Sequence, residues 1–299
     1  MAIASVAPRR RRRIRRGVVI KRTVVYLAAV AFTLWIGLPL WFTLTSSFTT
    51  PSAFGQIPAP LWPTSPTLDN FIAVLGLGEN RGTSATSEVS RVVTGMFHSF
   101  LVAGALVIID LIIAALSAYG LSRYRYRGSQ TFFTFVVLSR VVPGIALIGP
   151  FFVAFRVSGI LDTPFFVLLI SYQVFTLPLA IMLLKNYFDQ IPREVEEAGA
   201  IDGAGRLRIL WSIVTPLAVP GLVATAVLVF LESWSELFFA MTMTSQWTVP
   251  PILAGFQSLQ NFAWTELAAA TVLTLIPPVA VAMIFQRFVV AALASGTGK

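Results

Sequence analysis

The sequence predicts an all-α integral membrane protein with six transmembrane helices, cytoplasmic N- and C-termini and a cytoplasmic helix–turn–helix loop. Of its 299 residues, 56% are hydrophobic and only 12% are charged, whereas soluble domains carry about 25% charged residues. Six apolar runs are each long enough to cross a bilayer, which takes about 20 residues. Lys and Arg gather on alternate connecting segments, and this asymmetry sets the orientation.

The chain begins with a basic tail, residues 1–23, in which seven arginines lie within residues 9–16. The net charge of +9 could suggest nucleic-acid binding. However, no aromatic residues that could stack on bases are interleaved with these arginines. We therefore expect the tail to stay in the cytoplasm and contact anionic lipid headgroups, with no nucleic-acid partner. No small-residue cleavage site follows the first apolar run, so we expect that run to remain as an anchor.

The membrane domain is predicted to occupy residues 24–290, with a short C-terminal tail at 291–299. The six expected spans are Val24–Thr45, Phe97–Tyr119, Phe132–Phe155, Phe165–Lys185, Leu217–Phe239 and Leu267–Phe288.

The distribution of basic residues places the N-terminus inside the cell. The outer segments then hold only three basic residues, Arg81, Arg91 and Arg156. The inner segments hold the tail and the residues Arg123, Arg125, Arg127, Lys185, Arg193, Arg206, Arg208, Arg287 and Lys299. Two outer loops are long, residues 46–95 and residues 244–265.

The absence of cysteine excludes disulfides and Cys-ligated metals, and one histidine, His98, cannot build a metal cluster. We expect no metal site, and a structural position for His98 near a membrane boundary.

Residues 186–216 form a polar interruption between the fourth and fifth apolar runs. Pro192 suits the first turn of a helix because its missing N–H would have no partner there. The three glutamates of 194–197 then favour the positive end of the helix dipole. The Asp-Gly pair at 202–203 should end this helix, and its aspartate could cap a second helix near Ala204–Ile213. From shape alone, an ordinary interfacial amphipathic loop is the more common interpretation.

The residues of this loop resemble the cytoplasmic coupling loop of bacterial ABC-importer permeases. That pattern reads E-A-A-x-x-D-G-A and continues to I-x-x-P, and this chain has E-A-G-A-I-D-G-A at 197–204 and T-P-L at 215–217. Gly199 stands where the family usually has Ala, which should loosen the helix by up to about 1 kcal/mol. The resemblance implies that six residues couple the chain to an ATPase: Glu197, Ala198, Gly199, Asp202, Gly203 and Ala204.

The resemblance extends over residues 24–290 and is closest to the smaller, six-span permease of maltose-type sugar importers. The matching segments are A-Y-G-L-S-R-Y-R-Y-R-G at 118–128, L-P at 177–178, F-D-Q-I-P-R-E at 188–194, W-S-E-L at 234–237 and Q-R-F-V at 286–289.

Membership of that family implies a bacterial inner-membrane subunit that is not itself an enzyme. Its expected partners are a second homologous permease, two copies of a nucleotide-binding ATPase subunit, an extracytoplasmic sugar-binding protein and the sugar. ATP and Mg would be bound by the ATPase, because this chain lacks the G-x-x-x-x-G-K-[ST] phosphate loop, and it should hold no cofactor. The outer loop at 244–265, with Gln257 and Asn261, would contact the binding protein.

Several polar residues fall inside the predicted spans, where a charge costs about 2.5–3.5 kcal/mol and should face protein or water. Asp110 and Arg140 could form a structural bridge, or Arg140 could line the sugar path. Glu232 and Glu236 stand four apart near Trp234, a combination that suits carbohydrate but also occurs at membrane interfaces. The possible path residues are Arg140, Asp110, Tyr172, Gln173, Glu232, Trp234 and Glu236.

The sequence leaves two alternatives open. The chain could serve an ABC importer of a non-sugar solute, or it could be a stand-alone secondary transporter with Asp110 or Glu232 as its coupling carboxylate. A glycosidase using Glu232 and Glu236 is excluded, because the chain has no domain to build an aqueous cleft for a glycoside.

Overall fold

The computed structural model describes residues 16–58, 61–77, 89–124, 126–245, 247–256 and 263–296. Within these ranges every regular element is a helix, as the sequence predicts. The elements are α1 (Arg16–Ser47), α2 (Pro51–Phe54), α3 (Asp69–Val74), α5 (Val92–Arg123), α6 (Ser129–Ser139), α7 (Gly144–Ser158), α8 (Pro164–Phe188), α9 (Arg193–Ile201), α10 (Arg206–Ile209), the π-helical turn η1 (Leu210–Val214), α11 (Thr215–Leu217), α12 (Val219–Trp234), α13 (Phe238–Met243), α14 (Val249–Gly255) and α15 (Trp264–Gly296).

Four helices are long and apolar enough to cross a membrane, and each contains one of the predicted runs. A helix can cross a bilayer because all its backbone polar groups are hydrogen-bonded within the segment. These four candidate spans are Lys21–Ser47, Val92–Arg123, Pro164–Phe188 and Trp264–Val290. Two bent helix pairs add up to two more spans, which gives between four and six across the described residues.

The predicted run Phe132–Phe155 is a broken helix rather than a straight one. Its two parts, α6 and α7, meet at 96°. Pro143 stands directly before α7 with extended backbone angles, φ −61° and ψ 122°. Proline lacks the N–H that a continuing helix needs and disfavours helical geometry in the residue before it. The break therefore covers residues 140–143, and Arg140 is the residue that ends α6.

The predicted run Leu217–Phe239 is also interrupted. Ala218 separates the helical segment Arg206–Leu217 from α12, and the two meet at 81°. Pro216 and Pro220 lie in the first turns of α11 and α12, where a missing N–H is tolerated. α12 ends at Trp234, before the predicted end of the run.

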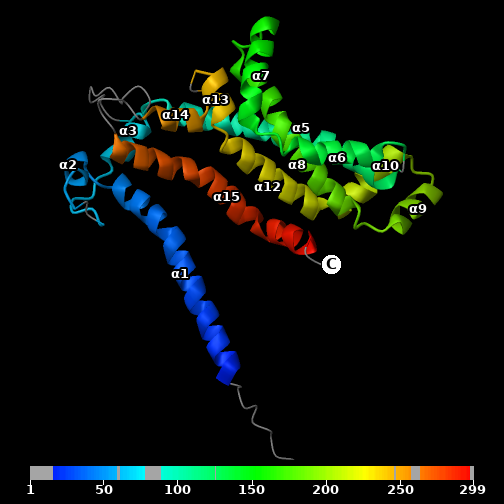
Figure 1. The fold of residues 1–299 in the computed structure, drawn as a ribbon, viewed down its shortest axis with the longest axis horizontal. Helices are drawn as coiled ribbons and strands as arrows, with labels where there is room; N and C mark the ends of the chain where they lie inside the picture. Colours follow the sequence, from blue (N-terminus) through cyan, green and yellow to red (C-terminus); the bar gives the residue numbers. More distant parts are fainter. Residues whose placement is uncertain are drawn as a thin grey trace, which may run out of the picture.

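The centre of the bundle is formed by α5, α8 and α12, and α15 runs along α12 (Figure 1). Leu106 of α5 and Leu168 and Leu184 of α8 are completely buried between these helices. α7 projects away from the bundle in Figure 1, while α9 and α10 lie together at one end of it.

α1 diverges from the rest of the fold. It meets α15 close to its own C-terminal end, and its N-terminal half extends away from the bundle (Figure 1). Large apolar side chains are exposed along α1, and that of Trp35 is 80% exposed. A surface of this kind faces lipid or another apolar chain.

The end of the bundle that carries α3 and α14 is held by buried polar contacts. The Asn70 amide donates to the carbonyls of Ser47 and Thr49, both at 2.9 Å, which ties α3 to the end of α1. His98 stacks on Trp247 with ring centroids 4.0 Å apart. This packing fits the structural position expected for His98, and the described residues contain no group that could hold a metal ion.

Candidate functional site

The segment α9–α10 begins at Pro192, which stands just before the first residue of α9 rather than within its first turn. Glu194 and Glu196 lie in that first turn, where the helix dipole favours negative charge. Asp202 ends α9 instead of capping the next helix, since the residue before α10 is Gly205. The local capping prediction for Asp202 was therefore wrong, because the chain needs three further residues to turn.

The turn after α9 has the hydrogen bonds of a Schellman motif. The N–H of Gly203 donates to Ala200 at 3.1 Å, and the N–H of Ala204 donates to Gly199 at 3.0 Å. Gly203 has φ +83°, a left-handed conformation that costs other residues about 1–2 kcal/mol. The Asp-Gly pair thus reverses the chain because glycine adopts this backbone conformation without steric penalty.

Gly199 lies where α9 touches the following helical segment. It is the buried residue of α9, and a Cβ there would clash with the Cδ1 of Ile213 and lie 3.7 Å from Ile209 Cγ1. The close approach of the two segments gives a physical reason for glycine at this position.

The opposite face of α9 is exposed. Glu197, Ala198 and Asp202 are all exposed, and Ile201 at the end of the helix is 86% exposed. Leu207 of α10 adds a side chain that is 64% exposed. Glu197 and Ile201 stand four residues apart and so share one side of α9. We call the exposed residues Glu197, Ile201 and Leu207 the α9–α10 face.

The inner face of α9 is fixed to α5. Glu196 accepts from the Nε of Arg123 and, at 3.0 Å, from the hydroxyl of Tyr119. Arg123 and Glu196 are only 7% and 12% exposed. Sequence reasoning singled out Glu197 and missed Glu196. Glu196 lies three residues before Gly199 and so shares its buried face, but the burial of that face is visible only in the structure.

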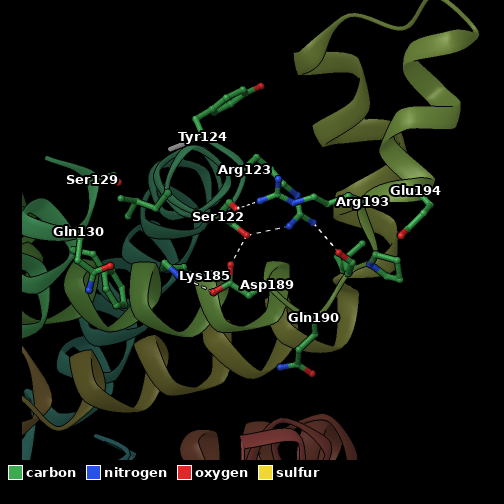
Figure 2. A pocket seen from close by; sticks show the side chains of 14 residues that line it. Ser122, Arg123, Tyr124, Ser129, Gln130, Lys185, Asp189, Gln190, Arg193 and Glu194 are labelled. Atoms are coloured by element: carbon green, nitrogen blue, oxygen red, sulfur yellow. Dashed lines mark hydrogen bonds and ion pairs between the residues drawn. The ribbon is translucent and has the colours of Figure 1, made fainter. Parts of the chain in front are cut away.

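A polar cavity of about 670 Å³ lies where α5, α6, α8 and α9 come together (Figure 2). The Ser122 hydroxyl donates to Asp189 at 2.5 Å, and Lys185 pairs with the same carboxylate at 2.6 Å. Arg123 donates to the carbonyl of Ile191 at 3.1 Å and Arg193 donates to the carbonyl of Ser122 at 3.3 Å. The cavity walls thus connect the ends of four helices through charged groups.

The expected pairing of Asp110 with Arg140 was wrong. Arg140 donates to the carbonyl of Phe175 at 2.8 Å and pairs with Glu232 at 3.2 Å. Asp110 is completely buried and accepts a hydrogen bond of 2.6 Å from Gln173. The break before α7 changes the direction of the chain at Arg140, which turns this side chain toward α12.

Three further path candidates take unexpected positions. Tyr172 is 1% exposed and Trp234 is 7% exposed, so neither presents a ring face to a solute. Glu236 lies beyond the end of α12 and therefore does not share a helical face with Glu232. Its carboxylate accepts from the N–H groups of Phe239 and Ala240, at 3.0 and 3.2 Å, and so caps α13.

A second cavity of about 580 Å³ adjoins the break between α6 and α7. Arg140, Glu232 and Glu236 line it together with Phe175 and Phe238. It brings together three of the predicted path residues. Gln257 and Asn261, the predicted contacts to a binding protein, lie outside the described residues.

Comparison with known proteins gives a consistent assignment. Residues 110–295 match the family of binding-protein-dependent transport system inner membrane components. The trehalose/maltose transport system permease protein MalG of Thermococcus litoralis is 32% identical over 81% of this chain and 84% of its own. The sn-glycerol-3-phosphate transport system permease protein UgpE of Yersinia enterocolitica is 33% identical over 65% of this chain and 70% of its own.

The fold has a counterpart among solved structures. A chain of a bacterial ABC transporter involved in the import of the acidic polysaccharide alginate superposes with a TM-score of 0.73, covering 91% of this chain and 98% of that one. At 24% identity this likeness shows the fold alone. The family match over more than half of the residues is decisive, and the chain belongs to the binding-protein-dependent transport system inner membrane components, the membrane-spanning permease subunits of ABC transporters.

Proposed function

We propose that the chain is the permease subunit of an ATP-driven importer that moves a sugar or oligosaccharide by alternating access, driven by a separate ATPase. Residues 186–216 would receive the force. The observation that carries this proposal is the α9–α10 face, where Glu197 and Ile201 share the exposed side of α9 and Leu207 is exposed in α10. Large exposed apolar groups next to a charge are typical of a protein interface.

Glu197 would pair with a basic residue of the ATPase, and the tight turn at Gly203 and Ala204 would fit the ATPase cleft. Closure of two ATPase subunits around ATP and Mg would then move the permease between inward-open and outward-open states. A ligand shifts such an equilibrium only through unequal affinity for the two states. The docking surface is therefore expected to change its contacts during the cycle.

We propose the remaining partners from what the family implies. The apolar surface of α1 supports contact with a second, homologous permease, with lipid covering the rest. The basic residues support an N-terminus inside the cell. An extracytoplasmic binding protein would contact the 244–265 loop through Gln257 and Asn261.

The substrate class is proposed from the second cavity and the named relatives. Arg140 can donate to hydroxyl groups, and Glu232 and Glu236 can accept from them. Phe175 and Phe238 add apolar surface beside these groups. A mixture of this kind suits a sugar, as the trehalose/maltose name of the relative supports.

A phosphorylated polyol is the second candidate. The glycerol-3-phosphate relative supports it, and so does Arg140, because a guanidinium binds phosphate oxygens in bidentate geometry.

The experiment is co-purification of the permease with its ATPase partner, followed by reconstitution with the binding protein. ATPase stimulation is then scored across trehalose, maltose, other sugars and sn-glycerol-3-phosphate. Stimulation by a sugar supports the proposal, and stimulation by glycerol phosphate alone selects the second candidate. Solute uptake without ATP would contradict both and indicate a secondary transporter.

A further inference from the structure

α9 contacts α5, although the two helices are far apart in the sequence. α9 continues directly from the end of α8 and into α10, whereas α5 ends about 70 residues earlier in the sequence. Non-covalent contacts of side chains join α9 to α5. The principal contact is the ion pair of Arg123 with Glu196, which the hydroxyl of Tyr119 supports at 3.0 Å.

This ion pair is nearly buried and well supplied with hydrogen bonds. Arg123 also donates to the carbonyl of Ile191, just before α9, and to the hydroxyl of Ser122. In the reverse direction, Arg193 of α9 donates to the carbonyl of Ser122 in α5. Figure 2 shows Arg123 and Arg193 converging on this end of α5. Removal of one partner from a buried pair leaves an uncompensated charge, so the contact resists separation.

α10 also contacts the end of α5. The guanidinium of Arg206, the first residue of α10, lies 4.7 Å from the ring centre of Tyr124, the residue that ends α5. A cation–π contact of this kind is independent of the ion pair at Glu196. Both sides of the turn at Gly203 are therefore held to the end of α5.

We infer that Glu196 and Arg123 are positioning residues that transmit displacement of the α9–α10 face to α5, an inference that rests on the coupling function proposed above. α5 packs along α8 and α12, and it carries Asp110 deep in the bundle. Movement of its end therefore reaches the helices that surround the second cavity. In this arrangement Glu197 contacts the ATPase, and Glu196 contacts α5 of the permease.

The test uses the complete complex of permeases, ATPase and binding protein in liposomes, and measures solute taken up per ATP hydrolysed. Glu196→Gln and Arg123→Gln should each lower this ratio about tenfold, a usual size for coupling between sites. The reversed pair Glu196→Arg with Arg123→Glu should restore a large part of it, because it rebuilds the contact. The control Asp162→Asn removes an exposed carboxylate after α7 and should keep the wild-type ratio.

A purely structural role predicts a different pattern. Uptake and hydrolysis would fall together with the yield of the complex, and the ratio would stay at the wild-type value, which would overturn the inference. Tyr119→Phe removes only one hydroxyl, so it provides a milder test if the charge variants do not assemble. It should also lower the ratio, and an unchanged ratio there would count against the inference. Failure of the proposed function is distinguishable, because the wild-type complex would then show no ATP-driven uptake.

Discussion

The guanidinium of Arg140 lies 3.2 Å from the carboxylate of Glu232, and this ion pair joins the break between α6 and α7 to α12. The two side chains are 31% and 28% exposed and both line the second cavity. An ion pair with this much exposure adds little to stability. Because the pair lines a cavity at a helix break, we propose that it serves solute passage more than folding.

Arg140→Gln and Glu232→Gln are each expected to reduce ATP-driven uptake at least about fivefold, while the permease still co-purifies with its ATPase. The double variant should be no worse than the worse single variant, since the two residues act through one contact. The measurement is uptake of labelled solute into liposomes. Arg156→Gln, an exposed arginine in the last turn of α7, is the control. Normal uptake by both single variants would remove these residues from the path.

Glu197→Lys is expected to leave the permease assembled in the membrane and to abolish sugar-stimulated ATPase activity. The substitution places a positive charge where a basic residue of the ATPase is proposed to bind, and like charges at an interface are repulsive. The measurement is ATP hydrolysis with and without sugar and binding protein. Asp162→Lys makes the same charge change at an exposed site after α7 and should have little effect. Normal transport by Glu197→Lys would reject the coupling role of this residue.

Gly203→Ala is expected to destabilise the α9–α10 turn by about 1–2 kcal/mol, because φ is +83° at this position. The loss should appear as a lower thermal unfolding midpoint of the purified permease in detergent. Gly205→Ala is the matched control, since Gly205 has φ −68° and a Cβ there meets no atom within 4 Å. Equal shifts for the two variants would show that the left-handed turn is unimportant.

Gly199→Ala is expected to change stability little, because two effects oppose each other. Alanine favours the helix by up to about 1 kcal/mol relative to glycine, but its methyl group must displace the Cδ1 of Ile213. Ile213→Val removes that carbon, so adding Gly199→Ala to Ile213→Val should recover most of the helix gain. A double-mutant cycle in the unfolding midpoint measures this coupling. Strict additivity would mean that the two side chains do not compete for space.

Much of the fold follows from the sequence. The four long apolar runs form helices because a lipid-facing backbone must satisfy its own hydrogen bonds. The Asp-Gly pair at 202–203 marks the end of α9 because glycine alone adopts the left-handed turn without cost. The loop pattern around Glu197 led to the family, since those residues are adjacent in the sequence and need no folding to be recognised.

Tertiary structure decided which polar residues meet. Arg140 pairs with Glu232 and not with Asp110, because Pro143 breaks the helix and redirects the chain. Trp234, one of the possible path residues, is buried.

The contrast between neighbouring glutamates shows the physical reason for this division. Sequence alone marks both Glu196 and Glu197 as acidic residues at the start of a helix. Successive residues of a helix point about 100° apart, so only the docking of α9 determines which one is buried. Glu196 meets Arg123 because α5, distant in the sequence, ends beside it. Adjacent residues determine the local chemistry of a segment, whereas the pairing of charges that are distant in the sequence depends on how the helices pack.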